Sequence, residues 1–303
     1  MKRRMTALAG GAALVAAAIV PTNAHAAVDN AVCQVWLGSV TAVGGQRNLT
    51  VTANVPPTIE QGKTLAVYQS GQVRLSARQT SEPGPGGDDR YGYVVIGDAL
   101  YYSRYRTDMV GDLDPSNPPS LGRIGGGWTN FTAIELADYA SYPDGTIHHT
   151  TFYGLRNDGV LFRWNQLNGG LRASGSYPGF ASVKSMALIA KTPTYDTFLA
   201  NTRGGALYTI RIPLASPLRP VVTPVRTRTW QGFETLSAAA CGKNGTLLLG
   251  IDKDAKTAYL YAVGHANGTA TVIQSRGLVP GTFDDPAYFR WVPISIFDGA
   301  NGD

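Results

Sequence analysis

The 303-residue chain contains few of the residues that usually carry catalysis or bind metal. It has only two cysteines and four histidines. The HExxH motif of zinc peptidases, the G-x-S-x-G motif of serine hydrolases and the phosphate-binding P-loop do not occur in it. Helical periodicity is also missing after Pro21, because glycine and proline interrupt the sequence too often. These absences argue against the common hydrolase and nucleotide-binding classes and against a helical fold.

The N-terminal segment has the features of a secretory signal peptide. Three basic residues, Lys2-Arg3-Arg4, precede an apolar segment over residues 6–20, and Ala24-His25-Ala26 provides a small-x-small cleavage site. The apolar segment is shorter than the roughly 20 residues that a membrane-spanning helix needs. We therefore expect a cleaved signal peptide over residues 1–26, no membrane span, and a secreted, extracellular protein that forms one domain over residues 27–303.

Cleavage of this segment would leave a protein with almost no net charge. The whole chain has 26 basic and 21 acidic residues, and the predicted signal peptide holds three of the basic residues and none of the acidic ones. The mature protein would therefore carry 23 basic and 21 acidic residues, a formal charge of +2. Its sequence contains no cluster of lysine and arginine that would favour nucleic acid or another polyanion as a partner.

The two cysteines are Cys33 and Cys241. In an exported protein, an even number of cysteines favours a disulfide bond over free thiols. The alternative is two separate buried thiols, since free cysteine often serves as a small core residue. We expect the disulfide.

Two short patterns recur about every 50 residues. The first is an aromatic residue followed three positions later by phenylalanine, in the pairs Trp128–Phe131, Tyr177–Phe180 and Trp230–Phe233, with a weaker copy ending at Phe283. The second is leucine followed directly by an aromatic residue, at Leu100, Leu161, Leu207 and Leu260. Because both patterns keep the same phase, they indicate a structural repeat rather than coincidence.

Each repeat reads as four short strands joined by tight turns. Apolar segments of five to eight residues alternate with Asn-, Asp- and Gly-rich turns, which supply the positive φ that hairpins require. Four strands in about 50 residues make one blade of a β-propeller. The predicted complete blades lie near residues 72–125, 128–174, 177–226 and 230–274.

The remaining strands lie at the two ends of the chain. Three predicted N-terminal strands lack a fourth, and the apolar segment 287–296 lacks neighbours. Pairing them would close the ring and remove free sheet edges. The sequence therefore predicts an all-β fold: a β-propeller of five four-stranded blades, closed by N- and C-terminal strands. Cys33 would lie in the closing blade and Cys241 in the blade before it, so a disulfide between them agrees with this count.

The segment 123–134, RIGGGWTNFTAI, together with YGLRNDGVLFRW over 153–164, resembles the tachylectin-2-type propeller family. That family repeats a Gly-Gly-Trp-x-x-Phe opening and a Gly-x-Leu-Tyr strand. The resemblance extends over about residues 97–283, and secreted actinobacterial proteins built on this propeller are similar as well. It implies a monomeric lectin that binds N-acetylated amino sugars in pockets between neighbouring blades.

The repeated aromatic residues have two interpretations. They can pack between blades, because one large aromatic side chain buries 150–250 Å² and a repeat unit needs its neighbours to cover its faces. Alternatively, an exposed indole can stack on the apolar face of a sugar, with nearby polar turn residues as hydrogen-bonding partners. The candidate carbohydrate-binding residues are Trp128, Trp164, Trp230, Asn157, Asp158 and Asn201.

The sequence offers weaker evidence for metal binding than for carbohydrate binding. Adjacent His148 and His149 would point to opposite faces of a strand, and His265 lies in a turn, so we predict no metal site and no cofactor. The acidic segment 108–114 lacks the fixed pattern of a calcium loop.

Two pairs of carboxylates could support glycoside hydrolysis, Glu135 with Asp138 and Asp196 with Glu234. The preferred hypothesis is nevertheless a secreted carbohydrate-binding protein that recognises N-acetylated amino sugars or a cell-wall polysaccharide. The alternatives are an extracellular polysaccharide hydrolase or lyase, and a propeller that serves as a protein-interaction scaffold.

Overall fold

The computed structural model describes residues 32–303 apart from 142–143, 168–169 and 295–297. The predicted signal peptide therefore lies outside the described residues. The described part of the chain is built of strands and contains no α-helix, and so no helix there is long and apolar enough to cross a membrane. The prediction of an all-β fold is confirmed.

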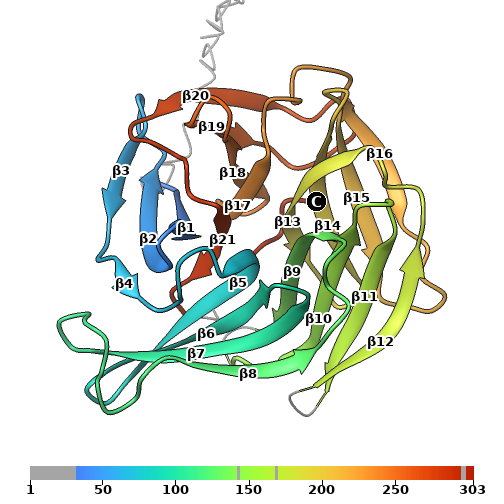
Figure 1. The fold of residues 1–303 in the computed structure, drawn as a ribbon. Coiled ribbons are helices and arrows are strands. Elements are labelled where there is room, and N and C mark those ends of the chain that lie inside the picture. Colours follow the sequence, from blue (N-terminus) through green and yellow to red (C-terminus); the bar gives the residue numbers. More distant parts are fainter. Residues whose placement is uncertain (1–31, 142–143, 168–169, 295–297) are drawn as a thin grey trace, which may run out of the picture. The chain divides into compact units, whose positions relative to one another are not determined.

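Three separate four-stranded antiparallel sheets follow one another along the chain, each a meander of consecutive strands (Figure 1). The first contains β9 (Phe131–Ala140), β10 (Ile147–Arg156), β11 (Leu161–Leu167) and β12 (Gly170–Tyr177). The second contains β13 (Val183–Lys191), β14 (Tyr195–Thr202), β15 (Leu207–Pro213) and β16 (Val221–Arg226). The third contains β17 (Thr235–Cys241), β18 (Gly245–Asp252), β19 (Thr257–Val263) and β20 (Ile273–Val279).

The remaining strands form one nine-stranded sheet. Its first part contains β1 (Gln34–Val40), β2 (Gly45–Thr52), β3 (Thr58–Gln61) and the short β4 (Leu65–Ala66). Its second part contains β5 (Val73–Gly84), β6 (Gly87–Ile96), β7 (Ala99–Asp108) and β8 (Ser120–Gly125). The C-terminal β21 (Ala287–Val292) pairs antiparallel with β1, as expected for strands from the two chain ends.

β21 also joins the two parts of this sheet. It pairs in parallel with β5 through Trp291–Gln79 and Val292–Thr80, so the two groups of strands are not separate sheets. Within residues 32–303, the first strands of successive sheets contact one another around a common centre (Figure 1). Four-stranded antiparallel sheets arranged in this way define a β-propeller.

The repeated phenylalanines pack between neighbouring sheets. Phe131 belongs to an apolar cluster that joins Tyr93 of β6 to Phe152 of β10, and Phe233 belongs to one that joins β14 to β18. A Cβ atom on Gly250 would lie 2.7 Å from the Phe233 ring, so the ring packs directly on the glycine backbone of β18. The aromatic repeat is thus the packing element that connects one sheet to the next.

The structure contains the predicted disulfide between Cys33 and Cys241. Cys241 ends β17, and Cys33 precedes β1 by one residue. The bond therefore links the last four-stranded sheet to the strands that pair with the C-terminal β21.

Candidate functional site

A cavity of about 320 Å³ lies between the strands β5–β8 and the sheet β9–β12. Tyr91 and Tyr93 of β6 and Tyr102 of β7 line one side of it. Asp138 of β9 and Gln166 of β11 line the other side. Each wall thus comes from a different sheet, and residues far apart in the sequence meet here.

The register of β6 and β7 builds an aromatic wall. Tyr91 and Tyr93 are two residues apart, so their side chains leave the same face of the strand. Tyr102 is paired with Tyr93 across the two strands. The Tyr102 ring centroid lies 5.2 Å from that of Tyr93 and 6.0 Å from that of Tyr91. The three rings therefore form one continuous surface, on which Tyr102 remains partly exposed.

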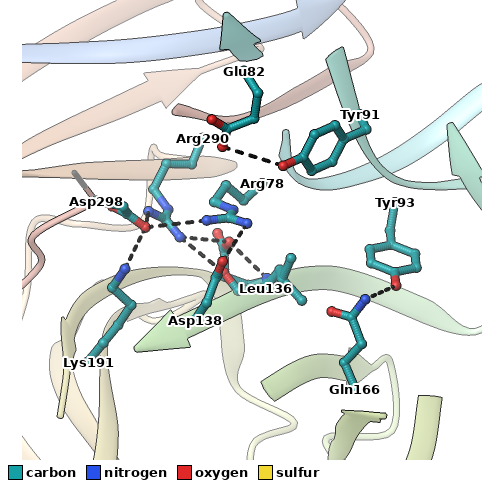
Figure 2. Close-up of polar contacts among 11 residues, drawn as sticks. Arg78, Glu82, Tyr91, Tyr93, Leu136, Asp138, Gln166, Lys191, Arg290 and Asp298 are labelled. Carbon is teal, nitrogen blue, oxygen red and sulfur yellow. Dashed lines mark hydrogen bonds and ion pairs between the residues drawn. The ribbon is translucent and has the colours of Figure 1, made fainter. Parts of the chain in front are cut away.

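Hydrogen bonds hold two of these rings in place (Figure 2). Gln166 Nε2 donates to the Tyr93 hydroxyl at 2.9 Å, and the Tyr91 hydroxyl donates to Glu82 Oε1 at 3.4 Å. Burial raises the pKa of Tyr91 to about 12, and the negative charge of Glu82 acts in the same direction. Burial likewise raises the pKa of Tyr93 to about 12. Near neutral pH these phenols are uncharged hydrogen-bonding groups on an apolar wall.

A buried ion pair forms the polar end of the cavity. Arg78 of β5 is 3% exposed, and its Nη2 donates to Asp138 Oδ2 at 2.9 Å. Asp138 is 9% exposed. Both side chains line the cavity. A ligand in this cavity would therefore meet tyrosine rings along one wall and charged groups at one end.

This ion pair belongs to a larger network of three cations and three carboxylates (Figure 2). Asp298 Oδ2 accepts hydrogen bonds from Lys191 Nζ at 2.7 Å and from Arg290 Nη1 at 2.5 Å. Arg290 Nη2 also donates to Glu135 Oε1 at 3.3 Å. Because the charges balance, the network can lie in the protein interior and fix the position of Arg78.

Three of the candidate residues named from the sequence are buried. Trp128 is 6% exposed and Trp230 is 5% exposed, so neither presents an indole face to solvent. Both pack in the clusters that join neighbouring sheets, as the packing interpretation predicted. Asn201 is fully buried, and its Nδ2 donates at 2.8 Å to the backbone carbonyls of Trp230 and Phe233. These side chains serve the packing of the sheets.

The other three candidates lie on the β10–β11 hairpin. Trp164 is half-buried and stacks on Phe162, with ring centroids 5.7 Å apart. Asn157 and Asp158 are exposed in the turn, where Asp158 forms an ion pair with Arg156. None of the six candidates lines the cavity described above.

Of the residues that line the cavity, the sequence singled out only Asp138, as half of a possible hydrolytic pair with Glu135. A signal for the tyrosines exists in the segment 91–102, where Tyr91 and Tyr93 alternate on one strand and Tyr101-Tyr102 follow on the next. Alternation shows that Tyr91 and Tyr93 share a face. It does not show that Arg78 and Asp138, 60 residues apart, meet beside them.

The carboxylates considered for hydrolysis are all bonded within the protein. Asp138 pairs with Arg78, and Glu135 pairs with Arg290. Asp196 is fully buried and accepts a hydrogen bond from the Tyr153 hydroxyl at 2.8 Å. Glu234 forms an ion pair with Lys184. These contacts explain the carboxylates as ion-pair and hydrogen-bonding partners between strands.

The histidines and the acidic segment 108–114 were also considered as metal ligands. His149 Nε2 lies 3.6 Å from Asp196 Oδ1, whereas His148 and His265 are exposed. Within the described residues, no three histidine, cysteine, aspartate or glutamate side chains come together as a metal site. In the acidic segment, Asp108 Oδ1 accepts hydrogen bonds from the backbone of its own turn.

The cavity lies at the first boundary, between β5–β8 and β9–β12. The second boundary, between the sheets β9–β12 and β13–β16, has different residues at the positions equivalent to those that line the cavity. The repeated leucines align Tyr93 and Tyr102 of the first boundary with Tyr153 and Arg163 of the second, since each pair lies directly across two neighbouring strands. Arg163 is 2% exposed, and its Nη1 donates to the Pro213 carbonyl of β15 at 2.6 Å. At the second boundary, the position equivalent to Tyr102 therefore holds a buried arginine that connects the two sheets.

The opposite wall changes in the same way. Thr150, which lines the cavity, pairs with Asp138 of the neighbouring strand. The same alignment places Asp196 of β14, paired with Lys191, at the position of Thr150. The Asp196 carboxylate bonds to the Tyr153 hydroxyl across the boundary. Direct hydrogen bonds thus join the two sheets at this second boundary.

Comparison with known proteins gives no family assignment. No family model matches the chain, and no curated protein matches it. The tachylectin-2-type resemblance therefore remains a prediction.

Among solved structures, the chain is similar to the fucose-recognising Aleuria aurantia lectin, a six-bladed β-propeller, with 14% identity, 83% of this chain and 82% of that chain covered, and a TM-score of 0.48. It is similar to AofleA from Arthrobotrys oligospora, with 10% identity, 87% and 90% covered, and a TM-score of 0.42. The catalytic domain of a Coprinopsis cinerea GH62 α-L-arabinofuranosidase matches with 14% identity, 76% and 70% covered, and a TM-score of 0.41. At TM-scores below 0.5, these likenesses carry no conclusion about function, which rests on the cavity.

Proposed function

We propose that this chain is a secreted, monomeric carbohydrate-binding protein whose saccharide site is the cavity between β5–β8 and β9–β12. The observation that carries this proposal is the combination of a tyrosine wall with a hydrogen-bonding polar end in one cavity of about 320 Å³. Such a volume lies at the small end of the range of ligand pockets, roughly 300–1,000 Å³. It suits one or two sugar rings rather than a long chain.

The chemistry of the two walls suits a sugar. A pyranose has C–H groups on one face and hydroxyl groups around its rim, so its face can pack on an aromatic ring while its rim forms hydrogen bonds. Tyr102 offers the partly exposed ring. Asp138, Thr150 and Gln166 offer donors and acceptors on the opposite wall, and Arg78 offers donors at the polar end. The resemblance to the tachylectin-2 type favours N-acetylated amino sugars or a cell-wall polymer as the source of that ring.

The proposal includes five blades for the propeller. The closing blade would contain β3, β2, β1 and β21, and β5–β8 would form the next one. This count is supported by the five apolar clusters found among the described residues, each between one group of strands and its neighbour. The signal peptide over residues 1–26 and export of the protein belong to the same proposal.

The test is to measure the binding of a panel of methyl glycosides, including methyl N-acetylglucosaminide, by isothermal titration calorimetry. We expect weak binding and no equivalent site at the second boundary, because Arg163 and Asp196 join the sheets there. Tyr102→Ala should weaken binding about tenfold or more, the effect of losing one stacking aromatic group at a binding hot spot. Tyr177→Ala is the matched control, since Tyr177 is exposed and lies outside the cavity.

Two results would contradict the proposal. Unchanged affinity in a folded Tyr102→Ala protein would exclude this cavity as the sugar site. Loss of binding on Trp164→Ala instead would move the site to the β10–β11 hairpin with Asn157 and Asp158. Assaying the same glycans for newly formed reducing ends separates the binding protein from the alternative hydrolase.

A further inference from the structure

Arg78 and Asp138, at the end of the cavity, have several polar atoms without a hydrogen-bond partner in the part of the chain that the structure describes. Arg78 and Asp138 bond to each other through Nη2 and Oδ2 only. Arg78 Nε and Nη1 and Asp138 Oδ1 are buried and lack a hydrogen-bond partner among the described residues. Arg78 Nη1 does lie 3.8 Å from Asp298 Oδ2, which is an ion-pair contact beyond hydrogen-bond distance. Two residues that line the cavity therefore carry both unused donors and an unused acceptor.

Such atoms are costly in a protein interior. A buried polar atom without a hydrogen bond loses its interaction with water and gains nothing in return, and the cost is larger for charged groups. Arg78 and Asp138 are both at least nine-tenths buried and both line the cavity. A ligand that satisfied these atoms would recover that free energy, so the pair is suited to ligand recognition as well as to joining β5 with β9.

The unused atoms have a specific complement. A guanidinium group only donates hydrogen bonds, an ionised carboxylate only accepts them, and a hydroxyl group does both. We propose that the Arg78–Asp138 pair recognises two neighbouring hydroxyl groups, a vicinal diol, on the bound sugar; this inference rests on the carbohydrate-binding function proposed above. One hydroxyl donates to Asp138 Oδ1, and its neighbour accepts from Arg78, while the face of the ring packs on Tyr102.

The same pair selects a neutral sugar over an acidic one. The network of Arg78, Arg290 and Lys191 with Glu135, Asp138 and Asp298 is already balanced in charge. A sugar carboxylate or phosphate that approached Arg78 would also face Asp138, which lies 2.9 Å from the guanidinium. Repulsion between like charges is strong where water is excluded. Uronic acids should therefore bind more weakly than the corresponding neutral sugars.

The first test changes the ligand and leaves the protein intact. The tightest-binding methyl glycoside of a neutral panel (glucose, galactose, mannose, fucose and N-acetylglucosamine) is compared with its monodeoxy derivatives, and with its uronic acid where the parent has a 6-hydroxyl group. Dissociation constants come from calorimetry or, for weak binding, from ligand-observed NMR titration. We expect about a tenfold or greater loss at two adjacent ring positions, since each removed hydroxyl bonds to a charged group. We also expect weaker binding of the uronic acid.

The second test changes the protein. Asp138→Asn keeps the size of the side chain but removes its charge, so the neutral glycoside should bind about tenfold more weakly and the preference against the uronic acid should disappear. Asp254→Asn is the matched control, because Asp254 is exposed in the turn between β18 and β19 and lies outside the cavity. Thermal unfolding shows whether each variant is folded. The deoxy series decides the matter if Asp138→Asn does not fold.

The outcomes separate this inference from the proposed function. If a neutral glycoside binds and depends on Tyr102, but all of its monodeoxy derivatives bind equally well, the diol inference is wrong and the carbohydrate site remains. Losses at two positions that are not adjacent would also overturn it. If no glycoside of the panel binds, both proposals fail.

Discussion

Asp298 offers a sharp test of the buried charge network. Its Oδ2 atom bonds to Lys191 at 2.7 Å and to Arg290 at 2.5 Å, and it lies 3.8 Å from Arg78 Nη1. Asp298→Asn preserves the shape of the side chain and removes one of three carboxylates that face three cations. The change therefore isolates charge from packing.

The expected loss of stability is large, because cations would remain buried without their counter-charge. Removing one partner of a buried ion pair typically lowers the free energy of unfolding by about 3–5 kcal/mol. Lys191 and Arg290 are only 4% and 5% exposed at their side chains, so water cannot replace the lost carboxylate. We expect Asp298→Asn to fall in this range near neutral pH.

The pH dependence provides a second readout. Burial by itself raises the pKa of Asp298, but the charges of Arg290, Lys191 and Arg78 outweigh it and hold that pKa well below its usual range. The unfolded chain takes up this proton near pH 4, whereas the folded protein takes it up only at lower pH. The stabilisation is therefore present above about pH 4 and is lost as pH falls through the folded-state pKa.

Urea unfolding, followed by tryptophan fluorescence between pH 3 and pH 8, measures both effects. The difference between the original protein and Asp298→Asn should be constant near neutral pH and should shrink below about pH 4, because the unfolded chain takes up the Asp298 proton before the folded protein does. Asp254→Asn, on the exposed turn between β18 and β19, should show no measurable change. If Asp298→Asn left the free energy of unfolding unchanged at pH 7, or if the difference between the two proteins grew in acid, the network would not be a stabilising element.

Two further predictions concern the links between sheets. The Cys33–Cys241 bond spans a sequence separation of 208 residues, and its reduction should destabilise the protein by at most about 5 kcal/mol in the chain-entropy model. Melting temperatures measured with and without reductant test this prediction. Two free thiols in exported, oxidised protein would contradict the bond itself. Phe233→Ala should lower the free energy of unfolding by about 3–5 kcal/mol, the usual cost of removing a buried aromatic ring; an almost unchanged urea midpoint would show that the ring on Gly250 does not hold the sheets together.

The strands and turns were predictable because their causes are local. Alternating apolar residues, glycine-rich turns and the Trp-x-x-Phe and Leu-aromatic patterns located the four-stranded units near 72–125, 128–174, 177–226 and 230–274, and the structure has a four-stranded meander in each. The pairing of β21 with β1 was also foreseen, because two incomplete groups of strands at the chain ends had unpaired edges. The parallel pairing of β21 with β5 was not, since no pattern in either strand specifies it.

The site was less predictable, because residue type alone does not decide whether an aromatic side chain enters the core or lines a cavity. Trp128 and Trp230 were candidates both for sugar stacking and for packing between blades, and they are buried between sheets. Tyr101 and Tyr102 are adjacent in sequence, yet they pack against different clusters because neighbouring residues of a strand point to opposite faces.

The sequence by itself therefore determined the repeat, the all-β fold and the pair of cysteines that the disulfide joins. Only the tertiary structure decided where ligand chemistry is concentrated. Arg78, Asp138 and Asp298 come from distant parts of the chain, and they meet because inner strands of neighbouring sheets and the C-terminal segment converge at one place. Hydrogen bonding at equivalent positions then distinguishes the two boundaries: Tyr102 and Thr150 border a cavity, whereas Arg163 and Asp196 bond the neighbouring sheets together.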